Sequence, residues 1–133
     1  MYIPHAVVQQ SAAFHGHLGP YLVLGLRMGI LAKNILGESP FLMTAEIHTK
    51  KTPPHSCILD GVQFSSGCTL GKGNITVKED DHIYGIFSSS SATVHITIKR
   101  TILVTIPKVP KPDIESCARD ILTKPDEELF VVS

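Results

Sequence analysis

The stretch from His15 to Gly29, HGHLGPYLVLGLRMG, decides the fold because it joins a tight turn to a long apolar segment. Proline cannot donate a backbone hydrogen bond inside a helix, but it is well suited to a helix's first position. The His-Gly-His-Leu-Gly-Pro segment therefore predicts a break between two helices, over residues 6–14 and 20–36. Gly37 follows as a suitable cap for the second helix.

The rest of the chain alternates between patterns typical of strands and patterns typical of helices. A rigid Pro-Pro loop should be followed by a short helix that Ser56 caps, and a glycine-rich loop over residues 67–74 should follow that helix. Apolar and β-branched runs predict strands, and an amphipathic run predicts a last helix. The expected strands are 41–49, 75–77, 82–87, 93–106 and 128–133, and the expected helix is 114–122. The prediction is a single α+β domain over residues 1–133, with a mixed sheet of about five strands covered by the N-terminal helices.

Composition excludes several classes of protein. The 133 residues carry 12 basic and 12 acidic side chains, so no overall basic charge points to nucleic acid or to an anionic membrane. The N-terminal residues lack the pattern of a secretory signal, and the longest apolar run is shorter than the ~20 residues of a membrane span. We therefore expect a soluble, cytoplasmic protein without nucleic-acid or membrane partners. Three cysteines, an odd number, favour free thiols over a disulfide framework.

His15 and His17 are the first candidate site residues. On a helix, side chains two positions apart point ~200° away from each other, whereas in an extended segment they point to the same side. Gly16 and Pro20 favour the extended geometry, in which both imidazoles can converge on one point. The alternative is that one histidine caps the following helix and the other is solvated.

Cys57 and Cys68 are candidate partners for these histidines. Cys57 opens the predicted short helix, where the helix dipole favours a thiolate. Cys68 follows that helix, and a returning loop would bring it back to the helix start. Ten intervening residues match no standard zinc-ribbon spacing, and the alternative is that both cysteines are small core residues. Asp60 is then either a carboxylate that accepts a hydrogen bond from a ligand histidine or a surface charge.

The loop SSGCTLGKGNI, residues 65–75, is a candidate anion site. Lys72 lies between Gly71 and Gly73, and Asn74 directly follows Gly73. The loop lacks the ending of a nucleotide triphosphate signature, but a nest of amide groups beside Lys72 would hold an anionic group of a substrate or cofactor. The alternative for the glycines is a turn that needs positive φ.

Four further histidines and one cysteine carry weaker signals. His55, two residues before Cys57, is a candidate extra ligand. His48, His82 and His95 are ordinary strand residues by their positions, and Cys117 falls on the apolar side of the last predicted helix.

Three blocks taken together resemble the family of the E subunit of formylmethanofuran dehydrogenase over roughly residues 7–100. The blocks are HGHLGPYLVLGLRMG, the Cys-Ile-Leu-Asp-Gly segment from Cys57, and SSGCTLGKGNI, and they follow the family's order. The resemblance implies a thioredoxin-like core with a five-stranded mixed sheet and an active-site metal, zinc in at least some members. Its matching positions are His15 or His17, or both, with Cys57 and Cys68 as the remaining candidates. Many members carry a C-terminal treble-clef zinc finger, and this chain resembles the version with the core domain alone.

The favoured hypothesis is a metal-binding accessory protein of anaerobic one-carbon or molybdopterin metabolism. Two imidazoles and two thiolates suit tetrahedral zinc, with iron as the second choice. The resemblance implies a molybdenum or tungsten formylmethanofuran dehydrogenase complex as partner. The alternatives are a thiol redox enzyme that uses Cys57 and Cys68, and a non-catalytic interaction subunit. The apolar helix 20–36 has more hydrophobic surface than one sheet face needs, which indicates a homodimer.

Overall fold

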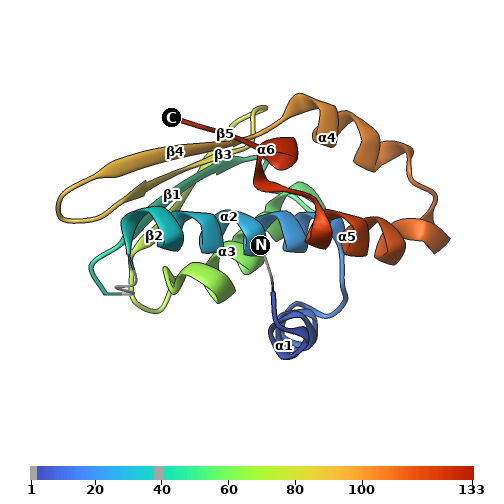
Figure 1. The fold of residues 1–133 in the computed structure, drawn as a ribbon, viewed down its shortest axis with the longest axis horizontal. Coiled ribbons are helices and arrows are strands. Elements are labelled where there is room, and N and C mark those ends of the chain that lie inside the picture. Colours follow the sequence, from blue (N-terminus) through green and yellow to red (C-terminus); the bar gives the residue numbers. More distant parts are fainter. Residues whose placement is uncertain (1–2, 38–40) are drawn as a thin grey trace.

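The computed structural model describes residues 3–37 and 41–133, which form a five-stranded sheet packed on a layer of helices (Figure 1). In Figure 1 the sheet lies above α2, α3 and α5, and α1 lies below them. The helices are α1 His5–His15, α2 Pro20–Leu36, α3 Ile58–Ser66, α4 Arg100–Thr105, α5 Ile114–Thr123 and α6 Asp126–Leu129. Short 3-10 turns cover η1 His55–Cys57, η2 Ile106–Lys108 and η3 Lys111–Asp113.

The sheet is mixed, as the sequence predicts. Its strands are β1 Thr44–Thr49, β2 Ile75–Glu79, β3 Tyr84–Ser88, β4 Thr93–Ile98 and β5 Phe130–Val132, in the spatial order β2-β1-β3-β4-β5. Strands β1 and β2 are parallel and the other three pairs are antiparallel. Alternate residues of β1, Ala45, Ile47 and Thr49, are buried against the helix layer, so Glu46 and His48 face the other side of the sheet. The α+β class is confirmed, and the thioredoxin-like topology stays a prediction.

Helix α2 is the centre of the core. It begins at Pro20 and ends at Leu36, as predicted, and every residue from Pro20 to Gly29 is buried. The turn before it starts at Gly16, whose φ of 115° is a left-handed conformation that ends α1. Because α2 packs against α3, α5 and the sheet, it fixes where the first residues of α3 lie.

The long strand predicted over residues 93–106 is wrong in its second half. Strand β4 ends at Ile98, and helix α4 begins at Arg100. The β-branched residues Thr101, Ile102 and Thr105 favour a strand locally, but Ile102 packs against the core from a helical turn instead. Tertiary packing therefore overrides local propensity in this segment. The first predicted strand also starts late, at Thr44 rather than at residue 41.

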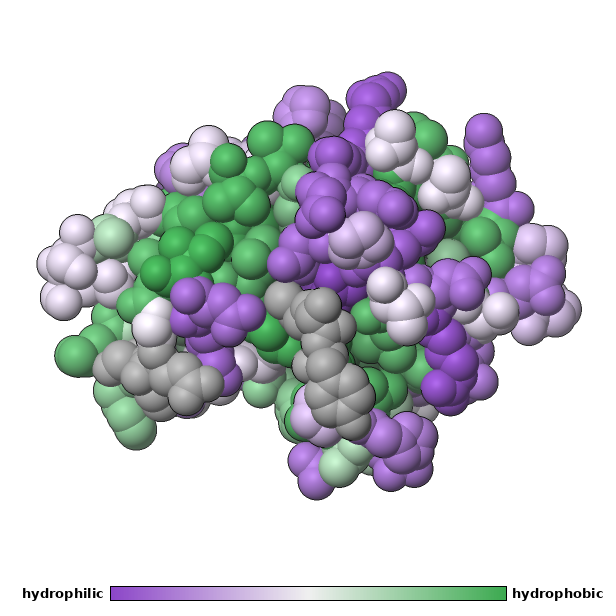
Figure 2. All heavy atoms as spheres, viewed as in Figure 1, coloured by the Kyte–Doolittle hydropathy of each residue, from purple (hydrophilic) through white to green (hydrophobic). Residues whose placement is uncertain are grey.

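Part of the surface is hydrophobic. Figure 2 shows hydrophobic residues gathered on the left half of this face, where α2 ends below β4 and β5. These elements include the exposed side chains of Ile35, Val131 and Val132. The homodimer expected from the apolar helix stays a prediction. Across the described ranges, no helix combines the length and the apolar character that crossing a membrane requires.

Candidate functional site

A pocket of about 690 Å³ lies where the start of α2, the turn η1 and the connection between α4 and α5 meet. In Figure 1 the start of α2 and the orange connection between α4 and α5 both lie toward the right of the molecule. This volume is within the usual range for a small-molecule site. The pocket gathers three of the four predicted metal ligands, and its lining residues are His15, His17, Gly19, Pro20, Tyr21, Leu22, Pro54, His55, Cys57, Ile106, Pro107, Val109, Lys111 and Ile114.

His15 is held by a carboxylate from another helix. Its Nδ1 atom lies 2.5 Å from Oδ2 of Asp60, in the first turn of α3. The His15 side chain is only 9% exposed, so this contact fixes the orientation of the ring. A neutral His15 that donates from Nδ1 keeps Nε2 as the nitrogen with a free lone pair. The predicted role of Asp60 as a hydrogen-bond acceptor from a ligand histidine therefore has the required geometry.

His17 lies beside His15, as the turn geometry predicts. The two ring centroids are 5.1 Å apart and the planes are inclined by 27°, so the rings stack. A side chain on Gly19 would place its Cβ 3.1 Å from Nε2 of His17, which means that the glycine leaves room for the ring. Since His17 is exposed, its ring can turn on a fast timescale.

Cys57 lies immediately before α3 and lines the same pocket. Burial raises the pKa of its thiol, and the negative charge of Asp60 raises the pKa further. The expectation that the helix start would favour the thiolate is therefore wrong for the protein without a bound cation. The physical reason is that the carboxylate in the first turn opposes the helix dipole, while burial removes solvent that would stabilise the charge.

Tyr21 and His55 form an aromatic wall of the pocket. Their ring centroids are 5.1 Å apart. Burial lowers the pKa of His55, and the positive charge of Lys50 lowers it further. Sequence reasoning gave His55 little weight and missed Tyr21, although a tyrosine directly after the helix-opening Pro20 was a usable signal. It also missed the wall from residues 106–114, which carries no local motif.

Cys68 is not part of this pocket, contrary to the predicted four-ligand set. It is completely buried at the far end of α3, and its thiol donates to the carbonyl of Met43 at 3.5 Å. Helix α3 has nine residues and spans ~13 Å, and Gly67 then turns the chain toward β1 with a left-handed φ of 79°. The loop after Gly67 contacts α3 where the Leu70 amide donates to Gln63, and none of its residues lines the pocket that contains Cys57.

The same placement argues against a dithiol made of Cys57 and Cys68. The Cα atoms of a disulfide lie at most ~7 Å apart, which is about half the length of α3. Both cysteines are free, and burial raises the pKa of the Cys68 thiol, so this sulfur is neither accessible nor activated.

The loop around Lys72 uses its own polar groups. The amides of Thr69, Leu70 and Lys72 donate to side chains of Asn74, Gln63 and Thr69 respectively. The amide of Gly73 donates to the carbonyls of Thr69 and Leu70, and its φ of 70° confirms the turn alternative. These four amides are therefore not available as an anion nest. Gly71, Lys72, Gly73 and Asn74 also lie at the end of α3 away from the pocket, with the Lys72 ammonium 3.1 Å from the Thr69 hydroxyl.

The donors at the pocket are close together but do not form a complete coordination shell. In the described part of the chain, no three His, Cys, Asp or Glu side chains are arranged as a group that could hold a metal ion. His15, His17 and Cys57 share one pocket, and His17 is the exposed one of the three.

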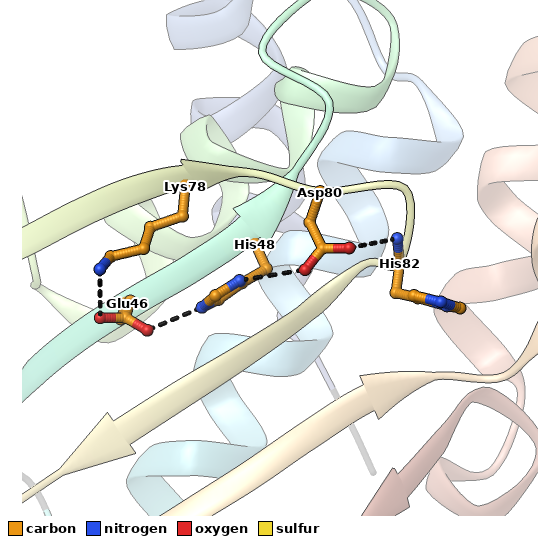
Figure 3. Close-up of polar contacts among 5 residues, drawn as sticks. All are labelled: Glu46, His48, Lys78, Asp80 and His82. Atoms are coloured by element: carbon orange, nitrogen blue, oxygen red, sulfur yellow. Dashed lines mark hydrogen bonds and ion pairs between the residues drawn. The ribbon is translucent and has the colours of Figure 1, made fainter.

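A second polar cluster lies on the uncovered face of the sheet, and we call Lys78, Glu46, His48 and Asp80 the strand ladder. Figure 3 shows His48 between the two carboxylates, with Nε2 2.7 Å from Glu46 and Nδ1 3.3 Å from Asp80. Lys78 lies 3.8 Å from Glu46, and Asp80 accepts a hydrogen bond from the backbone amide of His82. The ring of Tyr84 stacks on His48 at 4.1 Å. These contacts satisfy both ring nitrogens of His48, which fits a structural role.

Comparisons with known proteins show which family this chain resembles and how much of the chain, including the pocket, the match covers. A family model described as "FmdE, Molybdenum formylmethanofuran dehydrogenase operon" matches residues 14–131, which include every residue of the pocket. A protein of Archaeoglobus fulgidus named "Probable S-adenosyl-L-methionine-binding protein" is 38% identical over 68 residues. The match covers 50% of this chain and 19% of that protein, so the chain spans about a fifth of this relative's length.

Proposed function

The chain belongs to the FmdE family, and from this premise we propose that it is a metal-binding accessory protein of anaerobic one-carbon or molybdopterin metabolism. The metal in this proposal is zinc, with iron as the second choice. The observation that carries the proposal is the contact between His15 Nδ1 and Asp60 Oδ2. The second ring nitrogen of a metal-binding histidine almost always donates a hydrogen bond to such a partner.

The proposed ligands are His15, His17 and Cys57. Two imidazoles and one thiolate are a donor set that suits zinc, and the three residues line one pocket. This set replaces the four-ligand set predicted from the sequence, because Cys68 is buried at the other end of α3. A fourth position would be left for a water molecule or a substrate.

Each residue has a defined task in this proposal. Asp60 holds His15 in the tautomer that offers Nε2, and Gly19 leaves space for the ring of His17. Because burial raises the pKa of Cys57, metal uptake has to displace a proton from its sulfur. A zinc ion at an open site acts as a Lewis acid or lowers the pKa of a bound water.

Metal analysis of protein purified without chelator tests the proposal. We expect about one zinc ion per chain in the wild type, as for a single site. Cys57→Ser should lose most of the metal, and Asp60→Asn should weaken the affinity by about 10- to 100-fold. The measurement is elemental analysis by mass spectrometry, followed by a competition titration with a chromophoric chelator.

Cys68→Ser and Cys117→Ser are the matched controls, since both remove a thiol outside the proposed ligand set. Both should keep the full metal content. A Cys57→Ser variant that retains one metal ion per chain would contradict the proposal. Absence of metal from the wild type, together with co-purification of a larger formylmethanofuran dehydrogenase complex, would favour a non-catalytic interaction subunit instead.

A further inference from the structure

The pocket beside the proposed metal ligands has mostly apolar walls. One wall is the segment between α4 and α5, which contributes Ile106, Pro107, Val109 and Ile114. The lining also includes the neighbouring rings of Tyr21 and His55. Apolar side chains together with a pair of aromatic rings favour a flat ligand with a hydrophobic body.

Lys111 is the one permanently charged side chain in the described lining of the pocket. Within the described ranges, its lining includes three histidines and Lys111, and it includes no aspartate or glutamate. The nearby carboxylate of Asp60 is already in contact with His15. Among the described residues, Lys111 has no ion pair with a carboxylate. The pocket therefore offers a cation without a carboxylate partner at the edge of an apolar cavity.

We infer that this pocket binds a flat, largely hydrophobic small molecule that carries an anionic group, and that Lys111 pairs with that group. The shared chemistry is a planar ring system with a carboxylate, sulfonate or phosphate. This inference rests on the proposed function only in that it places the molecule beside the metal ligands. The ring system lies against Tyr21 and the 106–114 wall, and the anion reaches the ammonium of Lys111.

Two fluorescent probes with the same ring framework test the inference. 8-Anilinonaphthalene-1-sulfonate carries an anionic group, and N-phenyl-1-naphthylamine does not. Lys111→Gln should weaken binding of the sulfonate about three- to fivefold, as expected for one exposed ion pair, and leave the uncharged probe unchanged. The difference should shrink in ~1 M salt, where charges are strongly screened.

Two further variants locate the binding. Lys108→Gln changes an exposed lysine of the same connection outside the pocket lining, and it should leave both affinities unchanged. Val109→Trp fills the pocket and should weaken both probes strongly. Near-ultraviolet circular dichroism confirms that each variant is folded, since the sulfonate probe also binds loosely packed states.

Equal sulfonate affinity in the wild type and Lys111→Gln would overturn the pairing with Lys111. Probe binding that survives Val109→Trp would overturn the assignment of the pocket, and would point to exposed apolar side chains such as Leu70. Metal content, measured in the same samples, keeps this test separate from the proposed metal site. If neither probe binds but the protein retains its metal, only the proposed ligand class is refuted. If the probes bind but the protein contains no metal, only the proposed metal site is refuted.

Discussion

Arg27 is a charged residue with no solvent exposure, in the middle of the apolar helix α2. Its Nη1 atom donates to the carbonyls of Ile121 and Leu122 at 2.8 and 3.1 Å, in the last turn of α5. Its Nη2 atom lies 2.9 Å from Asp126. The guanidinium thus satisfies carbonyls at the negative end of a helix dipole and joins α2 to the C-terminal part of the chain.

Arg27→Ala should lower the free energy of unfolding by about 3 kcal/mol or more, because it opens a cavity and leaves buried carbonyls of α5 without a donor. Urea unfolding followed by circular dichroism measures the change. Arg119→Ala, which removes an exposed arginine paired with Glu115 on α5, is the control and should change stability by about 0.5 kcal/mol or less. Equal unfolding midpoints for the two variants would contradict the anchoring role of Arg27.

At the residue scale the sequence predicts local geometry better than partners. The turn at Gly16 and Pro20 follows from backbone chemistry, and it correctly predicts that His15 and His17 lie together. The partners of Arg27 lie 94 to 99 residues away in the sequence, and no local sequence pattern predicts them. The predicted position of Cys68 is wrong for the same reason, since the direction taken by a loop after a helix depends on what the loop packs against.

Helices α2 and α3 pack with their backbones in contact. A Cβ on Gly25 would lie 2.2 Å from the carbonyl oxygen of Ile58, and a Cβ on Gly61 would lie 2.2 Å from that of Leu22. Such distances leave no space for any side chain, so these glycines set the separation of the two helices. Asp60, next to Gly61, reaches His15 because α3 lies this close to the start of α2.

Gly61→Ala should destabilise the protein by about 1–3 kcal/mol, because the new methyl group forces the two backbones apart. This cost outweighs the gain of about 1 kcal/mol that alanine usually brings to a helix. Thermal or urea unfolding provides the measurement. Gly71→Ala is the matched control, since a Cβ there has no atom within 4 Å. A Gly61→Ala variant as stable as the control would show that the helices can move apart freely.

At the element scale, periodicity predicts helices and strands well where local and tertiary preferences agree. It predicts both ends of α2 and the start of α5 at Ile114. It fails over residues 99–106, where β-branched residues favour a strand but the chain has already left the sheet after Ile98. That failure concealed the 106–114 wall of the pocket, because a continuous strand would have placed these residues elsewhere.

We expect the strand ladder to make the stability of the whole molecule depend on pH. The hydrogen bond from His48 lowers the pKa of Glu46 below its ordinary 4.5, with Lys78 adding to the effect. The amide of His82 lowers the pKa of Asp80 below its ordinary 3.8, with His48 adding to the effect. Carboxyl groups whose pKa is lowered by folding stabilise the native state above their ordinary pKa. This contribution is lost as the pH falls through the lowered values.

The double variant Glu46→Gln/Asp80→Asn should be less stable than the wild type at pH 7, and its stability should fall less steeply between about pH 5 and pH 3. Urea midpoints at several pH values across this range measure both effects. Glu115→Gln, at an exposed carboxylate of α5, is the control and should follow the wild-type curve. Parallel curves for the wild type and the double variant would show that the ladder has no part in acid unfolding.

At the scale of the whole molecule, the sequence predicts the class and the number of strands but not the surfaces that result. The charge balance and the overall pattern of helices and strands depend on many residues. An error at the boundary of one element therefore does not change the predicted fold class. The pocket depends on three segments distant in sequence, at residues 15–22, 54–57 and 106–114. Only the first two of these segments carry sequence motifs. The family resemblance, rather than local pattern, predicts that these two segments belong to one site.

The close packing of α2 on α3 constrains one part of the pocket and leaves another part free to vary in sequence. Cys57 and Asp60 lie at the start of α3, whose backbone touches that of α2, and Asp60 in turn holds His15. The 106–114 segment is a surface connection between α4 and α5, whose length and side chains can change without disturbing that contact. The same fold can therefore change its ligand preference through substitutions in this one connection, while the proposed metal ligands stay in place.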